Sequence, residues 1–240
     1  AFEEHLVEAA GYSRSAAGDC RLHFTVSPSH QAGFEKLFEQ VAAAYESRLE
    51  ARFKTDFSVQ SPSTDTIAVD MADQPFRRSD SSLLFRPGGH GALLENLNQM
   101  ATDIVFIKNI DNVVHDRLKP ETIEKKQLLC GYLMLLQEKI FTYIETLAQN
   151  PPDEALTEEV ANFLTGELCA PPPESFYTAE PENRRRYLLD QLNRPLRVCG
   201  MVPNSGEPGG GPFWVKGRDG RLSIQIIETS QIDPEDEQQQ

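Results

Sequence analysis

The segment RPGGHGALLENL, residues 86–97, places three glycines and a histidine directly before an amphipathic stretch. Glycine has no Cβ, so the backbone of such a turn can approach a ligand closely. Backbone N–H groups at the start of the following helix, predicted over Ala92–Met100, would face an anion or the edge of a nucleotide. The alternative is a tight strand-to-helix connection without a ligand. The segment predicts a nucleotide-binding turn made of Gly88, Gly89, His90 and Gly91.

The segment IVFIKNIDN, residues 104–112, combines an apolar run with a polar end. Its first four residues, Ile104–Ile107, are compatible with a β-strand buried on both faces. Ligands of open α/β sheets bind outside the carboxyl ends of the strands, so polar residues there are placed for binding. Asp111 could instead cap the loop, as Asp and Asn often do. The pattern predicts binding residues at Asn109, Asp111 and Asn112.

The two segments together resemble a motif pair of the UDP-sugar pyrophosphorylases, which are nucleotidyltransferases with a GT-A-like fold. P-G-G-H-G resembles their P-P-G-H-G-D, and N-I-D-N resembles their N-x-D-N. The segment HFTVSPSHQAGFEKLF is similar to their strand-then-helix unit, and Gln60 and Glu228 fall where that family has a glutamine and a glutamate. The resemblance is patchy but collinear from about His23 to Ile232. More specifically, RPGGHGALLENLN, FIKNIDNV and GEPGGGPFWV resemble an uncharacterised bacterial domain family.

The resemblance implies an α/β fold class, namely a three-layer fold with a mixed, mostly parallel central sheet. Residues 1–240 would form one such domain, with a helical insertion at 119–193. Sugar nucleotidyltransferases begin with a G-x-G-x-R loop that cradles the triphosphate, and no such loop precedes FEEHLVEAA. We therefore expect the chain to be an internal fragment, incomplete at both ends and without turnover by itself.

The resemblance also implies roles for individual residues. The reaction would join a nucleoside triphosphate to a sugar phosphate and release pyrophosphate. Asp111 would be the catalytic carboxylate and would hold Mg²⁺, which takes one or two protein carboxylates and keeps its other positions for water and phosphate. The sugar would contact Asn112 and Glu228. The nucleotide would contact Gly88, Gly89, His90, Gly91, Gln60 and Asn109.

Two departures from the family leave another function open. Ala92 follows G-H-G where an acidic residue is expected, and Thr229–Gln231 replaces Y-S-E. The alternative is a catalytically inactive nucleotide-sugar binding module. A glycosyltransferase of the same fold is a third interpretation, although its usual D-x-D is not matched by Ile110-Asp111-Asn112.

Composition limits the partners. The formal net charge of −14 argues against binding to a nucleic-acid backbone, because such binding depends on Lys and Arg neutralising phosphates. No apolar run approaches the roughly 20 residues of a membrane span. The four cysteines are widely spaced, which favours reduced, mostly buried thiols of a cytoplasmic protein over a zinc site. The oligomeric state is left open.

Periodicity predicts the elements that must position these residues. Apolar alternation predicts a strand over Arg21–Ser27, and helical spacing predicts a helix over Gln31–Phe53. Three further helices are expected over residues 119–150, 153–168 and 182–192. Strands are expected over residues 57–60, 67–70, 196–202 and 213–227, the last range with a type I′ turn at Asp219-Gly220.

Overall fold

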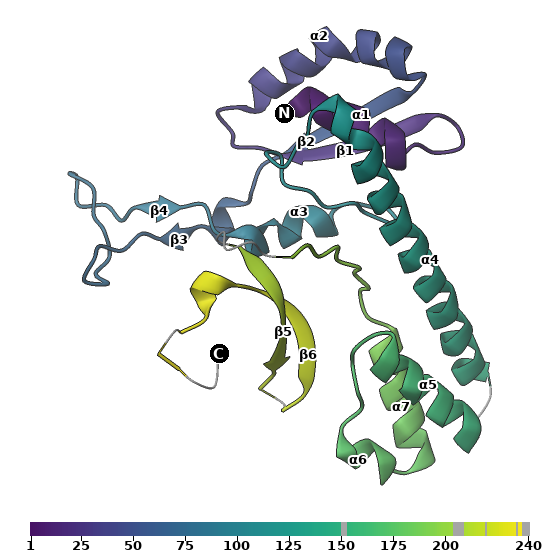
Figure 1. Ribbon diagram of the computed structural model, residues 1–240. Coiled ribbons are helices and arrows are strands. Elements are labelled where there is room, and N and C mark those ends of the chain that lie inside the picture. The colour runs from purple at the N-terminus through teal and green to yellow at the C-terminus, as the bar shows by residue number, and fades with distance from the viewer. Residues whose placement is uncertain (150–152, 204–208, 219, 234, 237–240) are drawn as a thin grey trace. The chain divides into compact units, whose positions relative to one another are not determined.

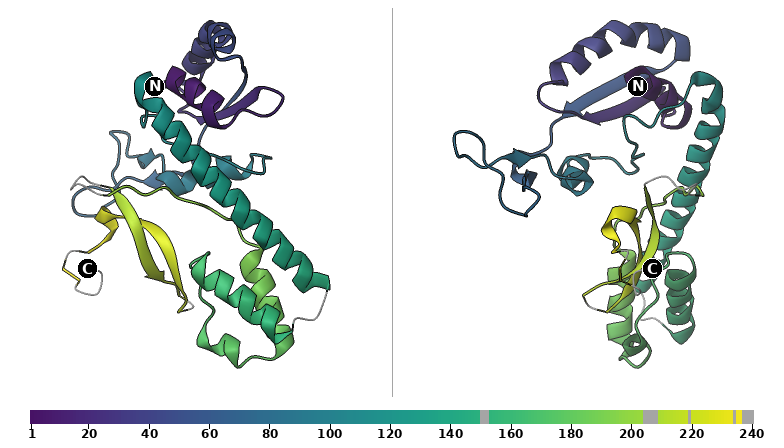
Figure 2. Two further views of the ribbon diagram at one scale, coloured as in Figure 1. Left: turned by 45° about the vertical axis from the view of Figure 1, so that its right-hand side comes forward. Right: turned by 60° about the vertical axis from the view of Figure 1, so that its left-hand side comes forward.

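The computed structural model describes residues 1–149, 153–203, 209–218, 220–233 and 235–236, drawn in colour in Figures 1 and 2. The chain divides into two compact units, Ala1–Lys126 and Gln127–Gln240. The boundary lies within the long helix α4 (Lys119–Gln149). Each unit has its own hydrophobic core, and each is described by itself.

Unit 1 is built on a β-α-β arrangement preceded by a helix. Its elements are α1 (Phe2–Tyr12), β1 (Asp19–Thr25), α2 (Gln31–Leu49) and β2 (Arg52–Ser58). The two strands are parallel, with Asp19 opposite Arg52 and Thr25 opposite Ser58. A parallel pair requires a crossover connection, which α2 supplies. Their carboxyl ends therefore meet at one edge of the sheet.

The core of unit 1 follows from two periodicities. On α1 the residues Phe2, Leu6 and Ala9 lie on one face and are buried, and on β1 the alternate residues Cys20 and Phe24 are buried. The Phe2 and Phe24 rings are 4.9 Å apart. Burying a side chain of this size contributes about 1.5–3 kcal/mol. The predicted strand over Arg21–Ser27 is thus confirmed within two residues at each end.

Helix α2 ends earlier than its apolar spacing predicts. Glu50 takes a left-handed conformation with φ 51°, and its backbone N–H bonds the carbonyl of Glu46. The chain then turns into β2, so the prediction of helix up to Phe53 is wrong. The strand predicted over residues 57–60 starts at Arg52 instead. Apolar spacing misses this boundary because Ala51 and Phe53, which are buried, continue the apolar pattern of the helix.

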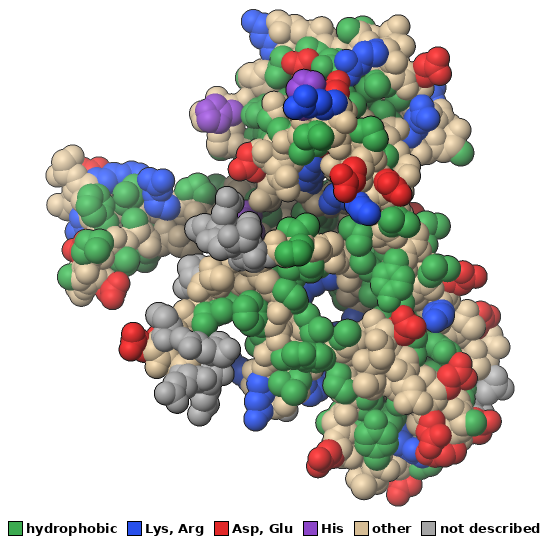
Figure 3. All heavy atoms as spheres, viewed as in Figure 1, with side chains coloured by type: hydrophobic (Ala, Val, Ile, Leu, Met, Phe, Trp, Pro, Cys, Tyr) green, Lys and Arg blue, Asp and Glu red, His purple; other side chains and the backbone are tan. Residues whose placement is uncertain are grey.

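A two-stranded arm follows β2. It contains the short helix η1 (Pro62–Thr64) and the antiparallel pair β3 (Thr66–Ile67) and β4 (Phe85–Arg86). Isolated bridges extend the pairing at Val69 with Pro75 and at Arg77 with Leu83. The arm exposes large apolar side chains, and Figure 3 shows hydrophobic and basic side chains gathered on it. The predicted strand at residues 67–70 is therefore shortened to the two residues of β3.

The segment after the arm differs from its prediction. The predicted helix over Ala92–Met100 is divided into a 3-10 helix, η2 (His90–Leu93), and a five-residue helix, α3 (Leu94–Asn98). Residues 104–107 form no strand, and Ile107 is 69% exposed. Phe106 instead packs on Tyr12 of α1, with 4.7 Å between the ring centroids. The apolar run is therefore anchored to a helix and is not buried between two strands.

Unit 2 has a helical core and a β-hairpin. The core is formed by α4, α5 (Glu154–Gly166), α6 (Glu174–Tyr177) and α7 (Pro181–Leu192). Leu147, Val160, Leu164 and Leu188 are among its most deeply buried side chains. The three predicted helices are present, and the ends that lie within the described residues differ from the predicted ones by at most two residues. Whether residues 119–193 are an insertion in a larger domain stays a prediction.

The hairpin pairs β5 (Gly210–Lys216) with β6 (Leu222–Glu228) in antiparallel register. The predicted pair of strands is thus present. Its turn is closed by the N–H of Gly220 bonding the carbonyl of Gly217 at 2.9 Å. The predicted type I′ turn involves Asp219, which lies outside the described residues. The strand predicted over 196–202 is wrong, because these residues have an irregular conformation and Met201 and Val202 are exposed.

The structure confirms a mixed α/β protein. Within the described ranges its strands form three separate two-stranded sheets, β1-β2, β3-β4 and β5-β6, and not the one mostly parallel central sheet that was expected. In those same ranges no helix is both long and apolar enough to cross a membrane. All four cysteines are free, but only Cys20 is buried and Cys199 is exposed, so the expectation of mostly buried thiols is wrong.

Candidate nucleotide site at the carboxyl edge of the first sheet

The carboxyl ends of β1 and β2 bring together polar side chains that are distant in the sequence. Ser58, the last residue of β2, lies opposite Thr25, the last residue of β1. The Ser58 hydroxyl is 2.7 Å from Nε2 of His23 and 3.4 Å from the Thr25 hydroxyl. Outward-facing polar residues at this edge of a parallel pair are in the usual position for ligand contact.

Asn96 of α3 closes this cluster. Its Nδ2 donates to the Ser58 hydroxyl at 2.8 Å and to the backbone carbonyl of Val59 at 3.0 Å. A carbonyl can only accept, so the second bond fixes the orientation of the amide. Asn96 is 6% exposed, and its Oδ1 has no hydrogen-bond partner among the described residues. The amide ties α3 to the end of β2 and leaves one buried acceptor unsatisfied.

The glycine turn meets this edge through Gly88. A Cβ at Gly88 would lie 2.6 Å from the backbone carbonyl oxygen of Thr64 and 3.5 Å from Nε2 of Gln60. Gln60 Nε2 donates to the Thr64 hydroxyl at 3.1 Å. Only glycine fits at position 88, since the close contact is with backbone. The structure therefore brings Gln60 and Gly88 together, two of the residues predicted to bind a nucleotide.

The other residues of the turn have no such packing requirement. Gly89, His90 and Gly91 are exposed, and a Cβ at Gly89 or Gly91 would meet nothing within 4 Å. Gly89 has φ −69°, which any residue adopts. The turn leads into only a short 3-10 helix and α3, so the helix dipole at its start is small. The space next to Gly89 and Gly91 is therefore open, as binding of a ligand at this turn would require.

Residues 109–112, called the NIDN loop below, form a second, exposed turn in unit 1. The N–H of Asn112 bonds the carbonyl of Asn109 at 3.2 Å, and Asn109, Asp111 and Asn112 are all exposed. The loop is held through its neighbours: Nε2 of His5 lies 2.9 Å from the carbonyl oxygen of Ile110. The His5 ring also contacts the ring of Phe24 in β1, with 5.9 Å between centroids. The loop is thereby linked to the β1-β2 sheet through α1.

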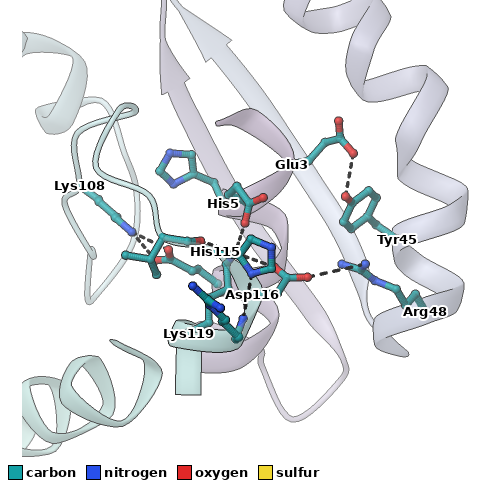
Figure 4. Close-up of polar contacts among 12 residues, drawn as sticks. Glu3, His5, Tyr45, Arg48, Lys108, His115, Asp116 and Lys119 are labelled. Carbon is teal, nitrogen blue, oxygen red and sulfur yellow. Dashed lines mark hydrogen bonds and ion pairs between the residues drawn. The ribbon is translucent and has the colours of Figure 1, made fainter. Parts of the chain in front are cut away.

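Lys108 fixes the other side of the loop (Figure 4). Its Nζ lies 2.6 and 2.5 Å from the two carboxylate oxygens of Glu8, a residue of α1 with no exposed surface. The Tyr12 hydroxyl donates to the same carboxylate at 3.4 Å. Burial raises the pKa of Tyr12 above its ordinary value, and the charge of Glu8 raises it further. Lys108 is therefore engaged by the fold and is not extended toward a ligand.

A second buried lysine anchors the end of the same segment. Lys119, 2% exposed, donates to the Glu4 carboxylate, to Asp116 at 2.7 Å and to the carbonyl of Val114 at 2.9 Å. Figure 4 shows Lys119 and Asp116 beside α1. Segment 106–119 is thus attached to one helix at several points. That attachment presents the NIDN loop to solvent in a defined conformation.

The exposed carboxylate of Asp111 could hold Mg²⁺ if phosphate oxygens and water supplied the other ligands. Within the described part of the chain, no group of three or more His, Cys, Asp or Glu residues is arranged as a metal site. Those residues therefore do not form a metal site in which protein side chains supply three or more of the ligands. A single exposed carboxylate suits Mg²⁺ that is shared with phosphate oxygens and water. The side chain fits that mode of binding.

Glu228 lies in unit 2, at the end of β6. Its side chain accepts from the backbone N–H of Gln231, while its own N–H donates to Gln231 Oε1 at 2.9 Å. These reciprocal bonds form a capping box for η4 (Thr229–Gln231). The carboxylate thus has a structural role, and its predicted contact with a sugar stays a prediction.

Sequence reasoning missed His23, Ser58, Asn96 and Glu8. His23 stands alone in the sequence, and the end of β2 is assigned two residues too late by its apolar pattern. Glu8 has the appearance of an ordinary acidic residue on an amphipathic helix. A detectable signal is the odd placement of Glu8 between the apolar residues Val7 and Ala9, where a helix face is expected to be buried.

Comparison with known proteins places the chain in a family. The model described as "Domain of unknown function (DUF4301)" matches residues 1–240. The chain belongs to this family. No curated protein and no solved structure matches it. The resemblance of RPGGHGALLENLN to an uncharacterised domain family is therefore confirmed, whereas these comparisons give no specific support to a relationship with the UDP-sugar pyrophosphorylases.

Proposed function

We propose that this DUF4301 domain binds a nucleotide at the carboxyl edge of β1 and β2, as part of a sugar nucleotidyltransferase with a GT-A-like fold. One observation carries the proposal. Both predicted binding loops are tied to this edge: the glycine turn through Gln60 and Thr64, and the NIDN loop through His5, which packs on Phe24. The β1-α2-β2 unit would be part of a larger, mostly parallel sheet in a cytoplasmic enzyme.

The chemistry of such a site is mainly positioning. An oxygen of a sugar phosphate attacks the α-phosphorus of a nucleoside triphosphate, and the bond to pyrophosphate breaks. The protein aligns the two substrates and offsets their charge. Asn109, His90 and the glycine turn would contact the nucleotide, and Asn112 and Glu228 the sugar. When bound by Asp111, Mg²⁺ would neutralise charge on the phosphates.

A catalytically inactive nucleotide-sugar binding module is the second candidate. Lys108 and Lys119, the lysines nearest to the NIDN loop in the sequence, are both paired with carboxylates of α1. A lysine that is already paired with a carboxylate does not neutralise the charge of a phosphate group during its transfer. That pairing favours binding without transfer, unless another part of the protein supplies the cation.

The proposal is tested by titrating the chain calorimetrically with UTP and a UDP-sugar, with and without Mg²⁺. Gly89→Val is the informative variant, because its side chain has room in the fold but occupies the space that a ligand would use. Its stability should change by no more than about 0.5 kcal/mol, while nucleotide affinity is lost. Asp111→Asn should retain the fold and lose the Mg²⁺-dependent part of the affinity.

Gly88→Ala is the matched control for packing. Its Cβ would press on the Thr64 carbonyl, so we expect a loss of stability of about 1–3 kcal/mol. Pyrophosphate release by a protein that contains this domain separates the two candidates: turnover supports the transferase, and binding without turnover supports the module. Equal nucleotide affinity of wild type and Gly89→Val would refute a site at the glycine turn.

A further inference from the structure

The outer edge of β2 carries backbone groups that no strand pairs. In a parallel strand, the N–H and C=O of successive residues point to opposite sides. The N–H of Arg52 bonds the carbonyl of Gly18, and the carbonyl of Ser58 accepts from Val26, so the even-numbered residues of β2 face β1. The backbone N–H and C=O groups of the odd-numbered residues, Phe53, Thr55 and Phe57, point away from β1. Among the described residues, β1 is the one strand that pairs with β2.

One end of this edge is already protected. The outward N–H of Phe53 donates to the Glu46 carboxylate of α2 at 2.9 Å. A side chain that covers an edge N–H prevents pairing with another chain at that point. Thr55 and Phe57 have no such cover in the described structure, and the Thr55 hydroxyl is also buried without a partner. The accessible part of the edge is therefore Thr55–Phe57.

A shallow cavity of about 330 Å³ opens along this part of the edge. Its lining residues come from α2 and β2 and are Glu35, Phe38, Glu39, Thr55, Asp56 and Phe57. Phe57 packs into the core of unit 1 beside Phe24, and Asp56, the preceding residue of the strand, has its side chain on the opposite face. Carboxylates therefore flank the edge on both faces of the sheet. On the face of Asp56 the strand also carries Lys54, whose charge is paired with Asp19 at 2.6 Å. A strand placed at this edge would therefore meet a carboxylate on each face of the sheet.

We propose that the edge of β2 at Thr55–Phe57 binds an extended, lysine- or arginine-bearing segment of a partner protein by strand addition. Backbone hydrogen bonds would supply affinity, and the acidic rim would select the partner's charge. A second copy of this chain is disfavoured as the occupant, because each copy has a formal net charge of −14. The inference does not depend on nucleotide binding, but it requires that any larger sheet of the proposed enzyme adds its strands on the side of β1 and not at the outer edge of β2.

The test uses the whole chain and a fluorescein-labelled seven-residue peptide that alternates lysine and valine. A second peptide of identical charge carries methyl groups on alternate backbone nitrogens and cannot pair as a strand. We expect the first peptide to bind at least tenfold more tightly by fluorescence anisotropy. It should also slow amide exchange at Thr55 and Phe57, measured by NMR. Absence of binding, equal affinity for both peptides, or unchanged exchange at these two amides would overturn the proposal.

Two exposed neighbours on α2 provide variants matched in charge. Glu39→Gln removes a negative charge and Gln40→Lys adds a positive one, so each changes the net charge by +1, but only Glu39 lines the cavity. Glu39→Gln should weaken binding at least threefold, and Gln40→Lys should change it less than twofold. An equal loss in both variants would mean that the peptide responds to overall charge, and the assigned edge would be wrong.

Discussion

At the scale of single residues, burial decides which polar groups serve the fold and which remain for a ligand. Lys108 and Asp111 are three positions apart, yet Lys108 is paired with buried Glu8 and Asp111 is exposed. A buried charge requires a partner, whereas an exposed carboxylate is stable in water without one. Asp111 is therefore available for a metal or phosphate complex, and Lys108 is not.

Tyr143 in unit 2 gives a prediction about alkaline pH. Burial, together with the 2.8 Å hydrogen bond to Glu159 and the charge of that carboxylate, raises its pKa to about 12 from the ordinary 10.0. The folded state thus keeps a proton that the unfolded state loses. Its stabilising contribution is complete below about pH 10 and is lost as pH rises through about 12.

Removing the Tyr143 hydroxyl should flatten this dependence. We expect Tyr143→Phe to lose less stability than wild type between about pH 10 and 12, measured by urea unfolding at several pH values. The ultraviolet difference titration of the two proteins should show a phenol with a pKa of about 12. A difference spectrum that titrates near 10 would contradict the structural assignment.

At the scale of elements, α1 organises unit 1. Two adjacent turns of this helix supply Glu4, His5 and Glu8, which hold Lys119, the Ile110 carbonyl and Lys108 respectively. Its apolar residues Phe2 and Leu6 pack in the same core as Cys20 and Phe24 of β1. One helix therefore connects the sheet to the NIDN loop. The loop's conformation depends on polar contacts, since its own residues are exposed.

The Glu8–Lys108 pair should control the order of that loop. Lys108→Met leaves the buried Glu8 carboxylate without its charged partner, which costs about 3–5 kcal/mol. Adding Glu8→Leu removes the uncompensated charge, so the double variant should regain part of that stability. Amide exchange over residues 104–118 should be faster in the single variant than in wild type. The check is a double-mutant cycle by urea unfolding; additive effects would show that the pair is not coupled.

At the scale of the whole molecule, the described residues form two hydrophobic cores. One is formed by α1, α2, β1 and β2, and the other by α4, α5, α6 and α7. The buried residues of the two clusters do not overlap. Each unit therefore has its own source of hydrophobic stabilisation.

We expect core mutations to act within one unit. Leu6→Ala in unit 1 and Leu164→Ala in unit 2 each truncate a side chain with at most 1% exposure and should cost about 2–5 kcal/mol. Hydrogen exchange measured by mass spectrometry should accelerate mainly over residues 2–58 for Leu6→Ala and mainly over 136–192 for Leu164→Ala. Equal acceleration in both regions by either variant would show that the units unfold as one.

The sequence by itself predicted the elements whose patterns are local. The helix α2, the strand β1, the helices α4, α5 and α7 and the hairpin β5-β6 are all present. These patterns depend on residues a few positions apart, and each element must bury one face whatever it packs on. The glycine turn was also recognised, and packing requires glycine at one of its positions, Gly88.

Tertiary structure alone decided what the apolar run at Ile104–Ile107 packs against and which polar residues meet. A short apolar run is stable against a helix or inside a sheet, and its sequence does not distinguish the two. Lys108 and Glu8 are 100 positions apart, and Asn96 and Ser58 are 38 apart. No local pattern encodes such pairs, because their free energy arises only when folding removes both partners from water.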